Sequence, residues 1–313
     1  MLLHFKKIYF NLVPDQSVTF KKFILCVLFS WYAFTMRAAT QTADSSHIST
    51  LKDAAEYLKK IPKPEASSFW PNVNPQYFLD NLNMYVKKPA YAFESSNTNF
   101  CGYTAISFIT LDHDPLGFVK GLVKLFKEGK LQMGQAILTP SEAVRKMAGR
   151  IKYKGMLDIN PATQMWFLTL ADHFKGYLNF FNKRYDAGDE NKMWAATNYA
   201  KFNRMLRQLF DWKVHPRGAD LVRPNISDLF NYLDKKLKTG TVFLYLNNRL
   251  LYKKRHVSTR FGIPTHYVVL LNIRKENELI NITYMDGRRK TFQQISPGLL
   301  NQIVYGVTHC NNR

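Results

Sequence analysis

Two apolar stretches near the C-terminus, His266-Tyr-Val-Val-Leu-Leu-Asn-Ile273 and Leu279-Ile-Asn-Ile-Thr-Tyr-Met285, are rich in β-branched and aromatic residues. A short polar segment separates them, so together they predict an antiparallel hairpin. The segment Thr241–Leu246 predicts a strand before the hairpin, and residues 305–309 predict a last strand after it. The end of the chain is therefore expected to form an antiparallel sheet.

The residues that precede this sheet carry helical signals from Cys101 to about residue 238. Asp114-Pro115 supplies an N-cap and a proline at the first helical position, and Gly129 supplies a C-terminal stop. Asn160-Pro161 repeats the same start signal, and a further helix is expected over residues 192–210. Helices followed by strands are typical of an α+β fold, in which a helical lobe packs on an antiparallel sheet.

Composition excludes several classes of protein. With 46% hydrophobic residues among 313, the chain has enough apolar material for a large core and too much for a disordered protein. Its net charge of +21, from 44 Lys and Arg against 23 Asp and Glu, favours an anionic partner. No nucleic-acid-binding motif accompanies the basic residues. We therefore expect contact with an anionic cell surface and no nucleic acid.

The N-terminus has the pattern of an export signal. Lys21 and Lys22 precede a 14-residue apolar run, residues 23–36, which is too short to span a bilayer comfortably but typical of a signal-peptide core. Small residues follow at 38–40. We expect residues 1–39 to be a signal peptide that directs export from a bacterial cytoplasm, to the periplasm or outside the cell. An uncleaved membrane anchor is the alternative.

Cys101 is the first candidate for chemistry. It follows an Asn-rich loop and opens a predicted helix, Cys101-Gly-Tyr-Thr-Ala-Ile-Ser-Phe108, with Asn99 as the expected N-cap. In the first turn of a helix, the dipole and the free backbone N–H groups favour a thiolate and can bind an oxyanion. An inert core cysteine is the alternative interpretation. We expect Cys101 to be a free thiol rather than disulfide-bonded to Cys310.

A thiol nucleophile needs a base and a group that orients the base. His266 begins the first strand of the predicted hairpin, and Asp286 ends the second. If the turn is centred on Glu276, His266 and Asp286 lie directly opposite each other on one face of the sheet. A register shift of one residue would separate them.

These motifs, Cys-Gly-x-Thr-Ala, His-Tyr-Val-Val-Leu and Tyr-x-Asp-Gly, resemble those of papain-like cysteine peptidases, and most closely the bacterial C39-like branch. The resemblance covers about residues 95–290. It implies a papain-like domain over residues 40–313 with a helical insertion at about 115–238. It also implies that Cys101 is the nucleophile, His266 the base and Asp286 the orienting group.

The same resemblance leaves one position unmatched. The glutamine that forms the oxyanion hole in the family would fall at Ser95, so Asn97 and Asn99 are the candidate replacements. The expected function is exported cysteine peptidase activity on a peptide or protein substrate, without cofactor or metal. The alternatives are acyl transfer of the transglutaminase or amidase type with the same triad, and a catalytically silent papain-like binding module.

Overall fold

A computed structural model describes most of the chain after its first 47 residues. The described ranges are 48–62, 64–93, 99–152, 159–175, 185–186, 188–189, 194–251 and 266–312. All of them belong to one compact unit, Ala43–Arg313. The predicted signal peptide, residues 1–39, lies outside the described residues. Among the described residues, no helix is both long and apolar enough to cross a membrane.

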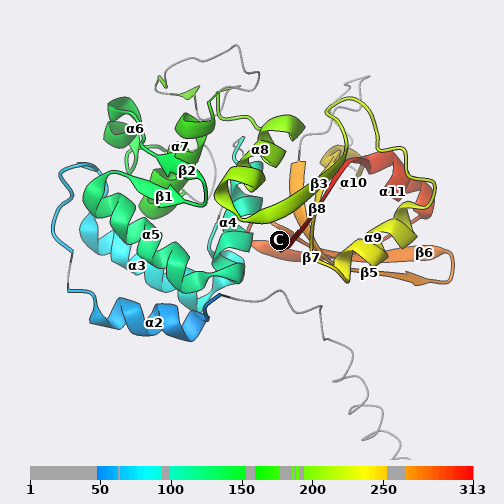
Figure 1. Ribbon diagram of the computed structural model, residues 1–313, viewed down its shortest axis with the longest axis horizontal. Coiled ribbons are helices and arrows are strands. Elements are labelled where there is room, and N and C mark those ends of the chain that lie inside the picture. The colour runs from blue at the N-terminus through cyan, green and yellow to red at the C-terminus, as the bar shows by residue number, and fades with distance from the viewer. Residues whose placement is uncertain are drawn as a thin grey trace, which may run out of the picture. The chain divides into compact units, whose positions relative to one another are not determined.

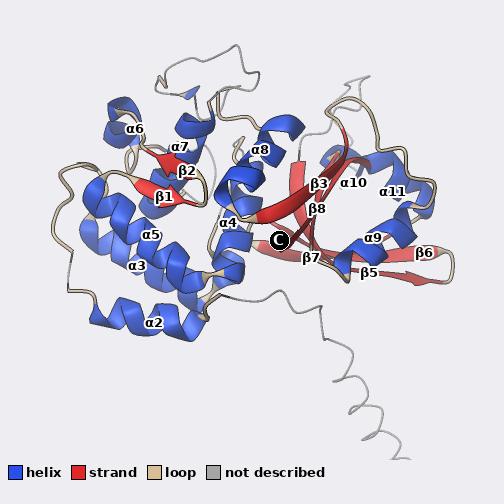
Figure 2. Cartoon of the chain, viewed as in Figure 1, coloured by secondary structure: helices blue, strands red, loops and turns tan. Residues whose placement is uncertain are grey.

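The C-terminal part of this unit is built on a six-stranded sheet in which every neighbouring pair is antiparallel (Figures 1 and 2). The strand order is β3-β8-β4-β5-β6-β7. The bounds are β3 (Trp212–Gly218), β4 (Thr241–Leu246), β5 (His266–Glu276), β6 (Leu279–Asp286), β7 (Arg289–Ile295) and β8 (Val304–Asn312). The last strand thus returns to the middle of the sheet, beside β4.

Both faces of the central strands are buried. The inner face, formed by Phe243, Tyr245, Tyr267, Val269 and Met285, belongs to the same apolar core as the helices of the N-terminal part. The outer face, formed by Val242, Leu244, Val268, Leu270, Ile282 and Tyr284, packs with the short helices α9 (Leu229–Leu237), α10 (Asn248–Leu251) and α11 (Pro297–Ile303). Burial on both faces explains the nearly continuous apolar runs of β4 and β5.

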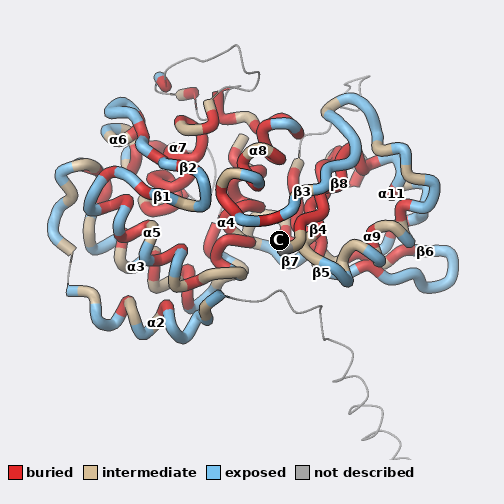
Figure 3. The backbone as a smooth tube through the Cα atoms, in the orientation of Figure 1, coloured by how far each residue is buried: buried red, intermediate tan, exposed pale blue. Residues whose placement is uncertain are grey.

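The N-terminal part is mainly helical, and two of its helices, α4 and α8, lie next to the sheet (Figure 1). Its elements are α2 (Leu51–Lys60), α3 (Pro75–Lys87), the 3₁₀ turn η1 (Pro89–Tyr91), α4 (Cys101–His113), α5 (Pro115–Glu128), β1 (Leu131–Met133), β2 (Ala136–Leu138), α6 (Glu142–Met147), α7 (Pro161–Phe174) and α8 (Tyr199–Leu209). Helix α4 is buried along nearly its whole length (Figure 3). A helix apolar on all sides belongs in the centre of a fold.

The expected α+β class and most helix boundaries are confirmed. Asp114 caps α5 by accepting a hydrogen bond from the Gly117 N–H at 3.0 Å, and Gly129 ends that helix with a φ of 67°. Asn160 caps α7 in the same way through the Thr163 N–H at 2.9 Å. These local signals were sufficient because the capping side chain and the helix it starts lie within three residues of each other.

The stretch 115–238, expected to be a helical insertion, is mainly helical but also contains strands. This stretch contains the β1–β2 hairpin and also β3, which pairs with β8 as an edge strand of the main sheet. The helix expected to begin at residue 192 begins at Tyr199, after the cap residue Asn198. Strand β3 contains Pro216, which is acceptable at the edge of a sheet, where one side of the strand has no partner. Because most of its residues are exposed, β3 has only a weak apolar pattern.

Candidate active site

Cys101 is the first residue of α4, as expected. Asn99 is not the N-cap, however, because that position is held by Phe100, whose side chain makes no capping hydrogen bond. The buried Phe100 ring packs against Tyr103 and Phe167, with ring centroids 5.7 and 5.3 Å apart, and so anchors the start of the helix. Cys101 itself is half-buried, whereas the second described thiol, Cys310, is only 2% exposed.

His266 and Asp286 meet at one end of the β5–β6 pair. Nε2 of His266 lies 2.5 Å from Oδ1 of Asp286. The two side chains are 14% and 19% exposed, so a path from solvent to the pair remains. A carboxylate bound to one ring nitrogen fixes the tautomer and orientation of an imidazole. The structure therefore brings together the histidine and aspartate that the sequence singled out.

The predicted register that led to this pair is wrong. The hairpin turn is Asn277-Glu278, with Glu276 paired to Leu279, and Asn277 adopts a φ of 55°. Val269 is opposite Met285, so continuing the ladder by one residue places Asp286 opposite Val268. His266 thus lies two residues away from the position opposite Asp286, on the diagonal, within reach of a long side chain.

A β-bulge restores the common face of His266 and Asp286. The register shifts between Leu270 and Asn272, so that Leu271 is an extra residue in β5. Had the pairing of Glu276 with Leu279 continued without this bulge, Asp286 would lie opposite Val269, on the inner face. His266 alternates with Tyr267 and belongs to the face of Val268. Because the extra residue is accommodated in a bulge, His266 and Asp286 keep a common face and can meet.

His266 also forms a side-chain hydrogen bond with Cys101. Because Nε2 is bound to Asp286, Nδ1 is the ring nitrogen available to the thiol. Burial lowers the pKa of the His266 imidazole. The hydrogen bonds to Asp286 and Cys101, together with the charges of those two groups, outweigh burial and raise that pKa to about 10. The arrangement favours a protonated, positively charged His266 beside the Cys101 sulfur at neutral pH.

Thr197 connects the two halves of this site, although no sequence motif marks it. A Cβ atom placed on Gly102 would lie 3.1 Å from the Thr197 Cβ, so the residue after the cysteine has to be small. The Tyr267 hydroxyl, from the residue after the histidine, donates a hydrogen bond to the Thr197 carbonyl oxygen at 3.2 Å. Thr197 thus touches both the helix of Cys101 and the strand of His266.

The oxyanion candidates are only partly described. Asn97 lies outside the described residues, and Asn99 lies two residues before Cys101 and is half-buried. The first N–H groups of an α-helix have no partner within the helix, so the start of α4 itself offers backbone donors next to the Cys101 sulfur.

Several other aspartate and histidine residues have structural roles. Asp114 caps α5, and the His113 ring packs edge-on against Trp212 at 5.3 Å. His309 contacts the Thr239 hydroxyl at 3.1 Å, whereas Cys310 belongs to the core on the inner side, so these neighbours point to opposite faces of the sheet. Among the described residues, no group of three or more His, Cys, Asp or Glu is arranged to hold a metal ion.

Comparison of the chain with protein-family models, with curated proteins and with solved structures gave no significant match.

Proposed function

We propose that this protein is a cysteine peptidase of papain-like type, closest to the C39-like branch, which hydrolyses peptide or amide bonds with Cys101, His266 and Asp286. One observation carries the proposal. His266 hydrogen-bonds to both Cys101, at the start of a buried helix, and Asp286, at the end of the neighbouring strand. Acyl transfer by a thiol requires a nucleophile in contact with a base, and a third group that orients the base. Cys101, His266 and Asp286 are arranged in this order.

The reaction begins with attack of the Cys101 thiolate on the carbonyl carbon of the substrate. The C–S bond forms as the carbonyl becomes an oxyanion, which the N–H groups at the start of α4 stabilise. The His266 imidazolium then gives its proton to the departing amine, and an acyl-enzyme thioester remains. Water, deprotonated by the now neutral His266, attacks the thioester and releases the acid and the thiol.

Asp286 keeps His266 in the orientation needed for both proton transfers. Its hydrogen bond to Nε2 leaves Nδ1 facing the sulfur, and its negative charge stabilises the imidazolium. Asp286 does not have to touch the substrate, so it acts as a positioning residue.

The expected setting also belongs to this proposal. We infer export from a bacterial cytoplasm from the apolar run at 23–36, and contact with an anionic cell surface from the net charge of +21. A peptide or protein is the proposed substrate, because Cys101, His266 and Asp286 lie in the motifs by which the chain resembles papain-like cysteine peptidases.

Product analysis tests the proposal and separates it from its rivals. Full-length protein is incubated with a diverse peptide mixture, with and without an added primary amine, and the products are identified by mass spectrometry. Hydrolysed peptides that disappear with Cys101→Ala support the peptidase. Amine adducts formed in preference to hydrolysis would instead indicate transglutaminase-type transfer, and no product from a folded protein would indicate a silent binding module.

A further inference from the structure

The loop between β3 and α9 presents two adjacent apolar side chains to solvent (Figures 1 and 3). Leu221 is 74% exposed and Val222 is 67% exposed. Among the described residues, no other two large, exposed apolar side chains are neighbours in the sequence. A single exposed apolar side chain is ordinary on a protein surface, whereas grouped ones indicate a contact surface.

The backbone of this loop is held on both sides of the apolar pair. The Ala219 N–H donates to the Val222 carbonyl oxygen at 3.0 Å, which closes a tight turn. Within the turn, the Asp220 carboxylate accepts the first N–H of α8 at 2.8 Å. After it, the Arg223 guanidinium donates to the Tyr305 hydroxyl at 2.9 Å and lies 4.5 Å from the centroid of that ring. The exposed pair is therefore held in place, and little conformational entropy is lost when it binds.

The residues around the turn are basic. Lys213 and Arg217 are exposed and lie on the same face of β3, because successive side chains of a strand alternate between faces. Arg223 is also exposed, and its remaining guanidinium N–H groups can bind an anion. Asp220 is the one acidic residue in the sequence of 212–224, and its carboxylate is hydrogen-bonded to α8. An apolar turn with basic residues at its base combines the two attractions that hold a protein at the surface of an anionic membrane.

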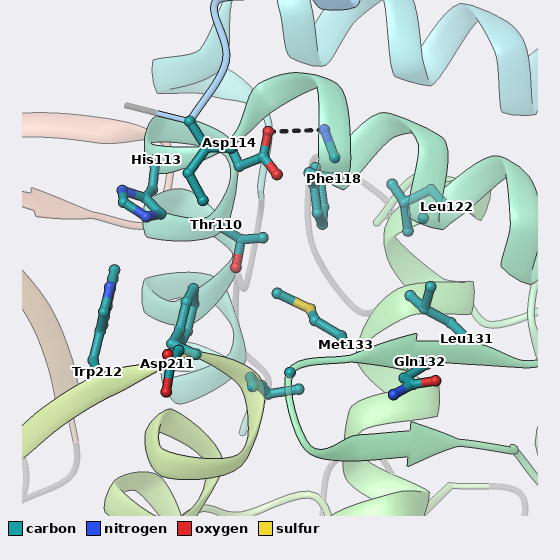
Figure 4. Close-up of a pocket in the computed structure, with 16 residues that line it drawn as sticks. Thr110, His113, Asp114, Phe118, Leu122, Leu131, Gln132, Met133, Asp211 and Trp212 are labelled. Carbon is teal, nitrogen blue, oxygen red and sulfur yellow. Dashed lines mark hydrogen bonds between the residues drawn. The ribbon is translucent and has the colours of Figure 1, made fainter. Parts of the chain in front are cut away.

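A second apolar feature, a cavity of about 510 Å³ at the start of β3, presents its side chains differently (Figure 4). Phe118, Leu122 and Met133 line its walls, with Trp212 on the other side. The surface of a bilayer contacts side chains that project from a protein rather than those that line a cavity. The turn at Leu221 is therefore the feature that suits a lipid surface.

We propose that the loop between β3 and α9 docks the protein onto an anionic lipid bilayer. Leu221 and Val222 insert among the lipids. Arg217 and Arg223, on either side of the turn, bind headgroup phosphates, and Lys213 adds positive charge at longer range. This inference rests on the proposed contact with an anionic cell surface, for which it names the docking surface, and it does not depend on the peptidase reaction. A zwitterionic bilayer lacks the charge attraction and binds more weakly.

The test places an environment-sensitive NBD fluorophore on the turn of the full-length protein. Cys26, Cys101 and Cys310 are replaced by alanine, and Leu221→Cys supplies the single thiol for labelling. The labelled protein is titrated with vesicles of equal parts phosphatidylglycerol and phosphatidylcholine. We expect brighter, blue-shifted emission as residue 221 leaves water, and about tenfold weaker binding to vesicles of phosphatidylcholine alone. Because the fluorophore reports on its own position, insertion of another part of the chain does not produce this signal.

Two matched controls accompany this measurement. Ile137→Cys, labelled in the same way, should give no change, because Ile137 is 64% exposed but lies on β2, outside the loop. Lys213→Gln combined with Arg217→Gln should weaken binding of the protein labelled at residue 221 about tenfold. The same loss of charge on α2, Lys59→Gln with Lys60→Gln, should have a much smaller effect.

Co-sedimentation with the mixed vesicles separates the possible failures. Binding without a fluorescence change at residue 221 would overturn the docking loop and leave the contact with an anionic surface in place. Absence of binding would overturn both, whereas neither result bears on peptide hydrolysis. Equal affinity for the two kinds of vesicle, or equal effects of the charge changes on β3 and α2, would also overturn the proposal.

Discussion

Nε2 of His266 lies 2.5 Å from Oδ1 of Asp286, although the ladder of β5 and β6 places Asp286 opposite Val268 rather than opposite His266. The bulge at Leu271 accommodates one extra residue of β5 and so keeps the two side chains on one face. The third member of the proposed triad, Cys101, comes from a helix far away in the sequence. A strand irregularity therefore has a direct chemical consequence.

Replacement of the two described cysteines should separate chemistry from packing. Cys101→Ala should abolish hydrolysis, because no other group can form the acyl-enzyme. Cys310→Ala should keep the rate and lower the melting temperature, because Cys310 is a buried core side chain whose removal leaves a small cavity. Peptide hydrolysis and thermal melts check both. Equal loss of activity in the two folded variants would contradict this assignment.

Asp286→Asn should lower kcat/KM by about 10²–10⁴-fold while leaving a measurable rate. It should also move the alkaline limb of the pH profile to lower pH. Asp286 helps raise the pKa of His266 to about 10, and loss of its charge lets His266 lose its proton earlier. A pH–rate profile with an unchanged alkaline limb would show that Asp286 does not act through His266.

Deletion of Leu271 should preserve the site. Leu270 is paired with Tyr284 and Asn272 with Thr283, so removal of the bulged residue makes these two pairs consecutive without changing either. His266 and Asp286 then keep their common face. We expect full reactivity of Cys101 and a loss of stability of about 1–2 kcal/mol from the half-buried leucine. A folded deletion variant with an unreactive Cys101 would refute the role given to the bulge.

Gly102→Ala should disturb the site without removing any reacting group. The new methyl group would lie 3.1 Å from the Thr197 Cβ, so either α4 or the Thr197 segment has to move. We expect a loss of about 1–3 kcal/mol in stability and a lower kcat. Thr197→Gly in the same protein should recover kcat, since it removes the opposing atom. Failure of this second change to recover kcat would contradict the proposed contact.

Two buried cations should give opposite pH dependences of stability. The raised pKa of His266 stabilises the fold below the unfolded value of 6.5, and this contribution is lost as pH rises towards about 10. Burial, and then the charge of Arg204, lower the pKa of Lys201 from 10.5 to about 7. The destabilisation caused by burying the Lys201 charge therefore disappears as pH rises from about 7 to 10.5.

In the wild type these two slopes oppose each other between about pH 7 and pH 10, each being at most about 1.4 kcal/mol per pH unit. Lys201→Met should expose the falling slope of His266, and His266→Ala should expose the rising slope of Lys201. Urea denaturation at several pH values measures both. The same pH dependence in both variants would show that these groups do not control it.

The elements of this fold were predictable where their signals are local. The caps at Asp114 and Asn160 and the strand Thr241–Leu246 are defined by residues close to one another, and the structure confirms them. The bulge at Leu271 has no local sequence signature. It depends on the position of the turn at Asn277 together with the apolar patterns of both β5 and β6.

Long-range contacts were also inaccessible from the sequence. Thr197 lies in a segment without a motif, and only the folded chain places it against Gly102 and Tyr267. The polar edge strand β3 was missed because it needs β8 as a partner and carries little apolar pattern of its own. His266 and Asp286 were predicted as partners from a turn that was wrong. The actual pairing differs from the assumed one by two residues at this end of the strands. A shift of two residues leaves each side chain on the same face of the sheet, so the partnership was still found.

The most direct test of the proposed Cys101–His266 pair is the rate at which iodoacetamide alkylates Cys101 at neutral pH. Cys26 and Cys310 are replaced by alanine, so that Cys101 is the single thiol. The account predicts rapid alkylation that slows by about tenfold or more in His266→Ala, because the thiolate loses its imidazolium partner, and is unchanged in His215→Ala, an exposed histidine of β3. An equal rate in His266→Ala and the parent protein would contradict the account.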